Sequence, residues 1–228
     1  MNDDEVLNLD TITDFGALGV GLDDLESEDV TLVSYVLDAS GSMGPHAADV
    51  VAAFGAEIAA MAGARTADQV LVSVTVFQDV ARLCFGYRKL ADVPRLDAGL
   101  YAPDGCTALF DAAYGALAHL DGYRAMLRDS GVRSRGVVLV MTDVEDNASR
   151  RRADEVKALA ARLSGDEGLV LAYVGFGGDG AAQAAQAAAL GFPTVLTTAL
   201  SAGEIRRVLG QVSRSVLRTG ARAPASFF

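Results

Sequence analysis

The sequence predicts an α/β domain in which a mostly parallel β-sheet is covered by helices on both faces, the doubly wound arrangement. Short runs of β-branched residues alternate along the chain with stretches of helical periodicity, as parallel strands joined by crossover helices require. One pair of runs is separated only by turn residues, which indicates a hairpin and therefore one antiparallel edge strand. A chain of 228 residues buries enough surface for a full core without disulfides or a structural metal.

The first strand and helix are predicted from a change of periodicity early in the chain. Val30–Leu37 is a β-branched run without helical spacing, and it ends in a polar turn. Pro45 suits a first helical turn, and the apolar residues after it recur at helical intervals until Gly63. Gln69–Phe77 and Ala81–Phe85 follow and form the predicted hairpin.

The second half of the chain repeats this alternation. A helix is predicted from Thr107 to Leu120, and the pattern allows it to continue through Leu127. The segments after it are the strands Gly136–Thr142, Leu169–Phe176 and Thr194–Thr197, and the helices Asp154–Leu163 and Ala181–Leu190. A final helix follows Ser201, because Ser201 and Glu204 have capping-box spacing and the later apolar residues line one face.

The negative charge is concentrated at the N-terminus. Ten acidic and no basic residues lie in 1–29, which leaves 20 acidic against 19 basic residues for the rest of the chain. We therefore divide the chain into an acidic N-terminal arm (1–29), a domain (30–219) and a C-terminal tail (220–228). Such an arm is either loosely docked or packs against the domain or a basic partner. The tail ends in Phe227 and Phe228, which fray, tuck back or bind a partner.

Composition argues against several classes of protein. No basic face stands out, so no nucleic-acid binding is expected. No apolar run approaches the roughly 20 residues that span a bilayer, and Met1–Asp10 is acidic, unlike a signal peptide, so no membrane association is expected. The two cysteines, Cys84 and Cys106, fit a reducing compartment. We expect a cytoplasmic protein.

Side chains with oxygen atoms gather where predicted elements begin or end: Asp38, Ser40 and Ser42 after the first strand, Thr107 before a helix and Asp143 after the strand 136–142. Ligands of open α/β sheets bind at the carboxyl ends of the strands. Two carboxylates and three hydroxyls suit Mg²⁺ or Mn²⁺, with waters and one free position. Taken singly, each residue is better explained by helix capping or a turn, and only their joint placement favours a metal site.

These loops resemble those of the von Willebrand factor type A domain, also called the integrin I-type domain. Ser34–Gly44 is similar to its Asp-x-Ser-x-Ser metal motif, Gly105–Ala112 to its threonine loop and Val138–Asp143 to its aspartate-bearing loop, in the family's order. The resemblance covers about Val30–Thr219 and implies a six-stranded sheet with one antiparallel edge strand. It also implies a metal ion-dependent adhesion site, in which both serines bind the metal, the threonine joins on ligand engagement and the aspartates bind directly or through water.

Two positions depart from the family pattern. Val144 follows the aspartate where a glycine is common, which would restrict the movement of that loop. Cys106 stands where a second glycine often precedes the threonine, and its thiol is expected to be structural because no base is evident nearby. Glu145–Asn147 is expected to be a solvated loop, with tuning of the local field as the alternative.

The site predicts a protein-binding module without catalysis of its own. A divalent ion held by two carboxylates and neutral hydroxyls stays electrophilic, so an aspartate or glutamate of another protein can complete its coordination. Bacterial intracellular members of the family often act beside an AAA-type ATPase or in multiprotein stress and defence assemblies, and the resemblance implies a partner of this kind.

A metal-dependent hydrolase or phosphatase that uses the same ion is the alternative. An aspartyl-phosphate enzyme would need a second aspartate where Ser40 stands, and around Ser42 only Gly44 fits a serine-hydrolase elbow. A third alternative is a structural subunit whose site holds no metal.

Other motifs carry weaker signals. His46 and His119 are expected on helix surfaces. Gly175–Gly180 satisfies Gly-x-Gly-x-x-Gly, but it follows the fifth strand and lacks the acidic residue of a dinucleotide site, so a turn that needs glycine is expected.

Overall fold

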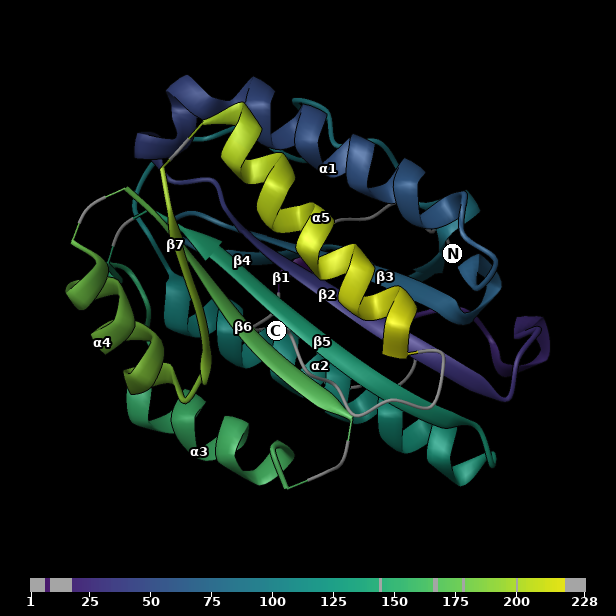
Figure 1. Cartoon of the computed structure of the whole chain (residues 1–228). Helices are drawn as coiled ribbons and strands as arrows, with labels where there is room; N and C mark the ends of the chain where they lie inside the picture. The colour runs from purple at the N-terminus through teal and green to yellow at the C-terminus, as the bar shows by residue number, and fades with distance from the viewer. Residues whose placement is uncertain are drawn as a thin grey trace.

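The computed structural model describes residues 7–8, 18–143, 145–165, 168–177, 179–199 and 201–219. Figure 1 shows a twisted central sheet with helices on both faces. The C-terminal tail with Phe227 and Phe228, Val144 and most of the first 17 residues lie outside the described residues.

Within the described residues the sheet has seven strands in the order β1-β4-β3-β2-β5-β6-β7. They are β1 (Leu7–Asn8), β2 (Asp29–Asp38), β3 (Val70–Phe77), β4 (Ala81–Lys89), β5 (Arg133–Thr142), β6 (Leu169–Phe176) and β7 (Thr194–Thr198). Five neighbouring strands are parallel, and β4 is antiparallel to β3. The six predicted strands, β2–β7, are confirmed as one sheet, but β4 is not the outermost strand, because the two-residue β1 pairs with it as a seventh.

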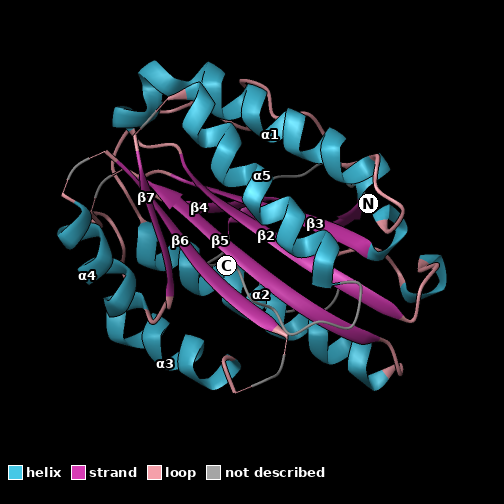
Figure 2. Ribbon diagram, in the orientation of Figure 1, coloured by secondary structure: helices cyan, strands magenta, loops and turns pink. Residues whose placement is uncertain are grey.

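The helices are α1 (Ala47–Ala62), α2 (Leu109–Asp129), α3 (Ala153–Leu163), α4 (Gly180–Leu190) and α5 (Ala202–Thr219). Buried residues of α1 and α5 share one hydrophobic core with the sheet, and those of α2, α3 and α4 share the other. Figure 2 shows the two helical layers on opposite sides of the strands. The predicted doubly wound α/β fold is therefore confirmed.

The position of β2 in the middle of the sheet explains why its apolar residues show no helical spacing. Val33, Tyr35 and Leu37 face the core under α1 and α5, whereas Leu32 and Val36 face the core over α2. Side chains of a strand alternate between the two faces, so a strand covered on both sides is apolar throughout.

The last helix begins with half of the predicted capping box. The backbone N–H of Glu204 donates to the Ser201 hydroxyl at 3.3 Å. The Glu204 carboxylate, however, accepts hydrogen bonds from Thr198 and Arg207, and the backbone N–H of Ser201 donates to Ala199. The ion pair with Arg207, at 2.7 Å, and the Thr198 hydroxyl lower the pKa of Glu204. The carboxylate therefore ties α5 to the end of β7 instead of returning to the cap.

Part of the acidic arm packs on the domain. The backbone N–H of Val20 donates to Tyr87 of β4 at 2.8 Å, and the N–H of Tyr87 donates to Leu18 at 3.3 Å. The Tyr123 hydroxyl of α2 donates to the carbonyl of Val20 at 2.8 Å. Of the two alternatives for the arm, packing on the domain holds for residues 18–20 and for β1, which pairs with β4.

The predicted surface position of His119 is wrong. Only 1% of the residue is exposed, its ring stacks on Tyr87 at 4.6 Å between centroids, and Nε2 lies 2.8 Å from the Leu18 carbonyl. A carbonyl only accepts, so Nε2 carries the proton. The docked arm covers this part of α2, and burial lowers the pKa of His119 to about 4. His46, in contrast, lies half-buried at the start of α1.

Candidate functional site

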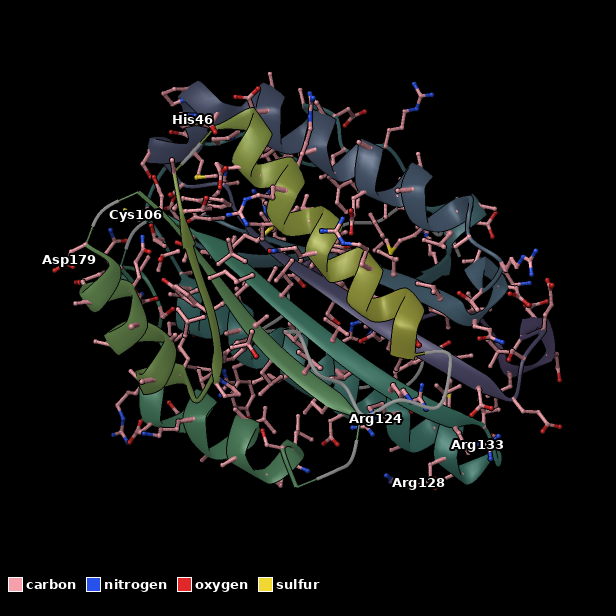
Figure 3. All side chains as sticks on the ribbon, viewed as in Figure 1. His46, Cys106, Arg124, Arg128, Arg133 and Asp179 are labelled. Atoms are coloured by element: carbon pink, nitrogen blue, oxygen red, sulfur yellow. The ribbon has the colours of Figure 1, made fainter. Side chains whose placement is uncertain are left out.

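The loops that carry the five predicted residues meet at one end of the sheet. β2 and β5 are parallel neighbours with Leu37 opposite Met141, so Asp38 and Asp143 emerge at the same edge. The loop after β2 is hydrogen-bonded to the loop that carries Thr107, since the Gly41 N–H donates to the carbonyl of Gly105 at 3.2 Å. Figure 3 shows His46 and Cys106 at this end of the molecule and Arg133, at the start of β5, at the opposite end.

Hydrogen bonds connect four of the five predicted residues. The hydroxyl oxygens of Ser40 and Ser42 lie 3.1 Å apart, and the Ser42 hydroxyl donates to Oδ1 of Asp143 at 2.9 Å. The backbone N–H of Ser40 donates to Oδ1 of Asp38 at 2.7 Å. Two hydroxyls and two carboxylates are thus gathered in one group.

Asp38 is the most enclosed member of this group, with 1% of the residue exposed. Its second carboxylate oxygen accepts a hydrogen bond from Thr142, and its backbone carbonyl accepts one from the Tyr101 hydroxyl at 2.7 Å. Burial raises the pKa of Asp38, the hydrogen bonds from Thr142 and Ser40 oppose this, and the nearby charge of Asp143 adds to the rise. The carboxylate is therefore held in a fixed orientation at a place where a cation would stabilise its charge.

Helix capping does not explain these residues. Ser40 precedes a 3₁₀ turn (Gly41–His46) without a side-chain capping bond. The N-cap of α1 is His46 and that of α2 is Ala108, and neither makes a side-chain capping bond. The turn alternative holds only in part, because Asp38 binds the backbone of Ser40 with one of its two oxygens.

Thr107 is attached by its backbone to the loop that follows Asp143. It is buried, its N–H donates to Oδ1 of Asn147 at 2.7 Å, and its carbonyl accepts from the N–H groups of Asn147 and Ala148. Among the described side chains, no hydrogen bond joins the Thr107 hydroxyl to the other four predicted residues. The structure brings the loop of Thr107 to the site without linking its side chain to the group.

The sequence did not indicate the role of Asp79, which lies in the turn between β3 and β4. Its carboxylate accepts a hydrogen bond from the backbone N–H of Cys106 at 2.8 Å and so holds the loop that carries Thr107. The hydrogen bond and the charge of Asp79 raise the pKa of the exposed Cys106 thiol. A raised pKa disfavours the thiolate, in keeping with a structural cysteine.

Gly105 gives this loop its shape, and replacing it with alanine is expected to destabilise the protein. Its φ is +68°, and a Cβ there would lie 2.7 Å from both carboxylate oxygens of Asp79. We expect Gly105→Ala to cost about 2 to 3 kcal/mol in urea unfolding, for backbone strain and the contact together. Gly131→Ala is the control, since φ is +81° there and nothing lies within 4 Å. Equal losses for the two variants would contradict the proposed contact.

The described residues of the glycine motif before α4, 175–177 and 179–180, fit the expected turn. Gly177 has a φ of +63°, and Asp179, labelled in Figure 3, caps α4 by accepting the N–H of Ala181 at 2.9 Å. The side chain of Gln183 fills the space next to Gly175, so that glycine serves close packing against α4.

The donor set decides which metal fits. Among the described residues, no three His, Cys, Asp or Glu side chains form a group that could hold a metal ion. Because Asp38, Asp143 and the serine hydroxyls all offer oxygen ligands, a site built from them suits a hard ion that accepts neutral oxygens and waters, such as Mg²⁺ or Mn²⁺. The neighbouring oxygens of Ser40, Ser42 and Asp143 fit such an ion.

The strand order, the two helical layers and the loops at one edge define a fold like that of the von Willebrand factor type A domain. A von Willebrand factor type A protein from Catenulispora acidiphila superimposes with a TM-score of 0.54 at 15% identity, covering 83% of this chain and 43% of that one. BatB from Bacteroides thetaiotaomicron gives a TM-score of 0.51 at 18% identity, covering 83% of this chain and 99% of that protein.

A minor pilin has a similar fold. The PilB minor pilin from Streptococcus sanguinis gives a TM-score of 0.63 at 12% identity, covering 88% of this chain and 64% of the pilin. This chain thus spans less than two thirds of the length of that pilin. No protein-family model matches the sequence, and no curated protein is found as a relative. Identities this low establish the fold alone.

Proposed function

We propose that this chain is a protein-interaction module whose site holds Mg²⁺ or Mn²⁺ and takes a carboxylate from a partner protein. The observation that carries the proposal is the hydrogen-bonded group of Ser40, Ser42 and Asp143, joined to Asp38 through the backbone of Ser40. The shared fold with a von Willebrand factor type A protein supports the interaction role.

The residues divide the work between charge and orientation. Asp38 and Asp143 would supply negative charge to the ion, and Ser40, Ser42 and Thr107 would supply neutral oxygens. The bound ion would supply a Lewis-acidic position for an incoming carboxylate. Ser42 is exposed whereas Asp38 and Ser40 are buried, so the partner side chain approaches from the side of Ser42.

We propose no catalytic activity for this site, and a metal-dependent hydrolase or phosphatase stays the alternative. His119 is buried under the arm and does not serve as a base for the site. His46 lies at the same end of the molecule as Cys106, which keeps the alternative open to a test (Figure 3). Turnover of a generic phosphoester with Mn²⁺ that is lost in His46→Ala would favour the hydrolase.

The setting is also a proposal. We propose a cytoplasmic assembly, such as one with an AAA-type ATPase or a stress or defence complex, as the place of the partner. Cys84 and Cys106 are free thiols, which supports a reducing compartment. In the part of the chain that the structure describes, no helix has both the length and the apolar character to cross a bilayer. The neighbour described as a minor pilin makes an extracellular assembly the competing setting.

Titration with Mn²⁺ tests the metal part of the proposal. We expect the intact chain to bind one Mn²⁺ in calorimetry, and Ser42→Ala to weaken this binding by roughly tenfold or more because it removes a neutral oxygen. Ser130→Ala is the control, since Ser130 follows the far end of α2 and its hydroxyl donates to the Met126 carbonyl of that helix. If the intact chain binds no Mn²⁺ at millimolar concentration, the metal site is wrong.

Affinity capture tests the partner. Proteins recovered from native lysate with Mg²⁺ are expected to be lost with chelator and in Ser42→Ala, and to be retained in Ser130→Ala. If the same proteins are recovered with Mg²⁺, with chelator and with both variants, a structural subunit without metal would be the better explanation.

A further inference from the structure

The helix that follows Thr107 is capped by a different loop. The N-cap of α2, Ala108, makes no side-chain capping bond, so the first N–H groups of the helix need partners from elsewhere. Side chains of the loop after β5 supply them. The N–H of Phe110 donates to Asp146 at 3.2 Å, and the N–H of Asp111 donates to the Ser149 hydroxyl at 3.1 Å.

The same loop also holds the residue before the helix. The side chain and the N–H of Asn147 both bond to the backbone of Thr107, at 2.7 Å and 3.0 Å. A pair of hydrogen bonds to one residue fixes both its position and its rotation. Thr107 is therefore attached to the loop that begins at Asp143, three residues before Asp146.

Helix α2 also binds this loop through a buried carboxylate. Asp111, in the first turn of α2, accepts the backbone N–H groups of Arg150 and Arg151 at 3.0 Å and 2.9 Å. The Ser149 hydroxyl in turn donates to Asp146. Donors and acceptors thus run in both directions, as in a capping box, but between segments 36 to 40 residues apart.

We propose that Asn147, Asp146, Ser149 and Asp111 are positioning residues that lock the Thr107 loop to the Asp143 loop, so that these two parts of the metal site are held as one unit. The inference rests on the proposed function, because it concerns how that site is kept ready for its ion. The expected solvated loop at 145–147 holds for Glu145 and Asn147, which are exposed, whereas Asp146 is half-buried. The side chains of Asp146 and Asn147 nevertheless accept hydrogen bonds from the backbone N–H groups of Phe110 and Thr107.

Asn147→Ala tests the lock, with Glu145→Gln as the control at the exposed neighbouring position. We expect Asn147→Ala to weaken Mn²⁺ binding by about tenfold, as the loss of an outer partner of a metal site does, and Glu145→Gln to change it by less than threefold. Asn147→Asp keeps the oxygen that accepts the Thr107 N–H and is expected to restore most of the binding. A purely structural role would lower the melting temperature and leave Mn²⁺ affinity unchanged.

Hydrogen exchange of the metal-free protein gives a readout that does not depend on the ion. We expect the amide of Thr107 to exchange at least tenfold faster in Asn147→Ala than in the intact chain or in Glu145→Gln. If Mn²⁺ binds Asn147→Ala as tightly as the intact chain, the lock is wrong while the metal site stands. If the intact chain binds no Mn²⁺, the proposed function fails, and unchanged exchange at Thr107 would overturn the lock as well.

Discussion

Gly86→Ala is expected to lower the free energy of unfolding by roughly 3 to 4 kcal/mol. A Cβ at this position of β4 would overlap the carbonyl oxygen of Leu18 and lie 2.7 Å from its carbonyl carbon. These are backbone atoms that cannot rotate away, so the arm must leave the strand. The hydrogen bonds of Leu18 and Val20 to Tyr87, His119 and Tyr123 would be lost with it, at about 1 kcal/mol each.

Urea unfolding measures this loss, and Gly55→Ala is the matched control. Gly55 lies in α1 with nothing within 4 Å of an added Cβ, and alanine favours a helix over glycine by about 1 kcal/mol. Gly19→Ala provides a second test from the side of the arm, because its Cβ would overlap the ring of Tyr123. If Gly86→Ala is as stable as Gly55→Ala, the arm is not docked as described.

The second large effect is a loss of stability in mild acid through His119. The pKa of His119 is about 4 in the folded protein, and its ordinary value is 6.5. At pH values between these two, the unfolded chain binds a proton on this residue and the folded chain does not. The contribution is fully present above pH 6.5 and is lost as the pH falls towards 4. At pH 4.5 we expect the loss to be roughly 2 to 3 kcal/mol relative to pH 7.

His119→Gln isolates this contribution. Glutamine still carries a donor for the Leu18 carbonyl but has no proton to gain. Carboxylates such as Asp38 titrate in both proteins and cancel in the difference. We therefore expect urea midpoints at pH 7 and pH 4.5 to differ less in His119→Gln than in the intact chain. The same dependence on pH in both proteins would show that His119 is not buried in its neutral form.

The fold was predictable because each element carries its own periodicity. β2, with apolar residues facing both cores, reads as a buried strand in any context, and α2 repeats its apolar residues at helical spacing. The sequence could not predict that Glu204 accepts a hydrogen bond from Thr198 instead of completing the capping box, because it does not show that the end of β7 lies within reach of α5.

The candidate site was predictable in its residue types and not in its supports. Asp38, Ser40, Ser42 and Asp143 could be grouped because parallel strands end at a common edge, and the structure joins them by hydrogen bonds. Asp79 and Asn147 act on backbone N–H groups 27 and 40 residues away, and an aspartate or asparagine in a turn has the same local signal whether or not it does so.

The placement of His119 failed for a related physical reason. The spacing of apolar residues along a helix shows which face packs on the sheet. It does not show whether a segment far away in the sequence covers the rest of the helix surface. Leu18 lies 101 residues before His119. The acidic composition of the arm left open whether it docks, and the contact with β4 depends on Gly86 of β4, which has no Cβ that would overlap Leu18.

The docked arm has a consequence for the order in which the chain folds during translation. The ribosome makes Leu18 and Val20 before their binding partners, since Tyr87 follows about 70 residues later, and His119 and Tyr123 are separated from the arm by 101 and 103 residues. Residues 18–20 therefore have no place to bind until β4 and most of α2 have left the exit tunnel. Its docking is a late step of folding, and before that step the edge of β4 is open to pairing with other nascent chains.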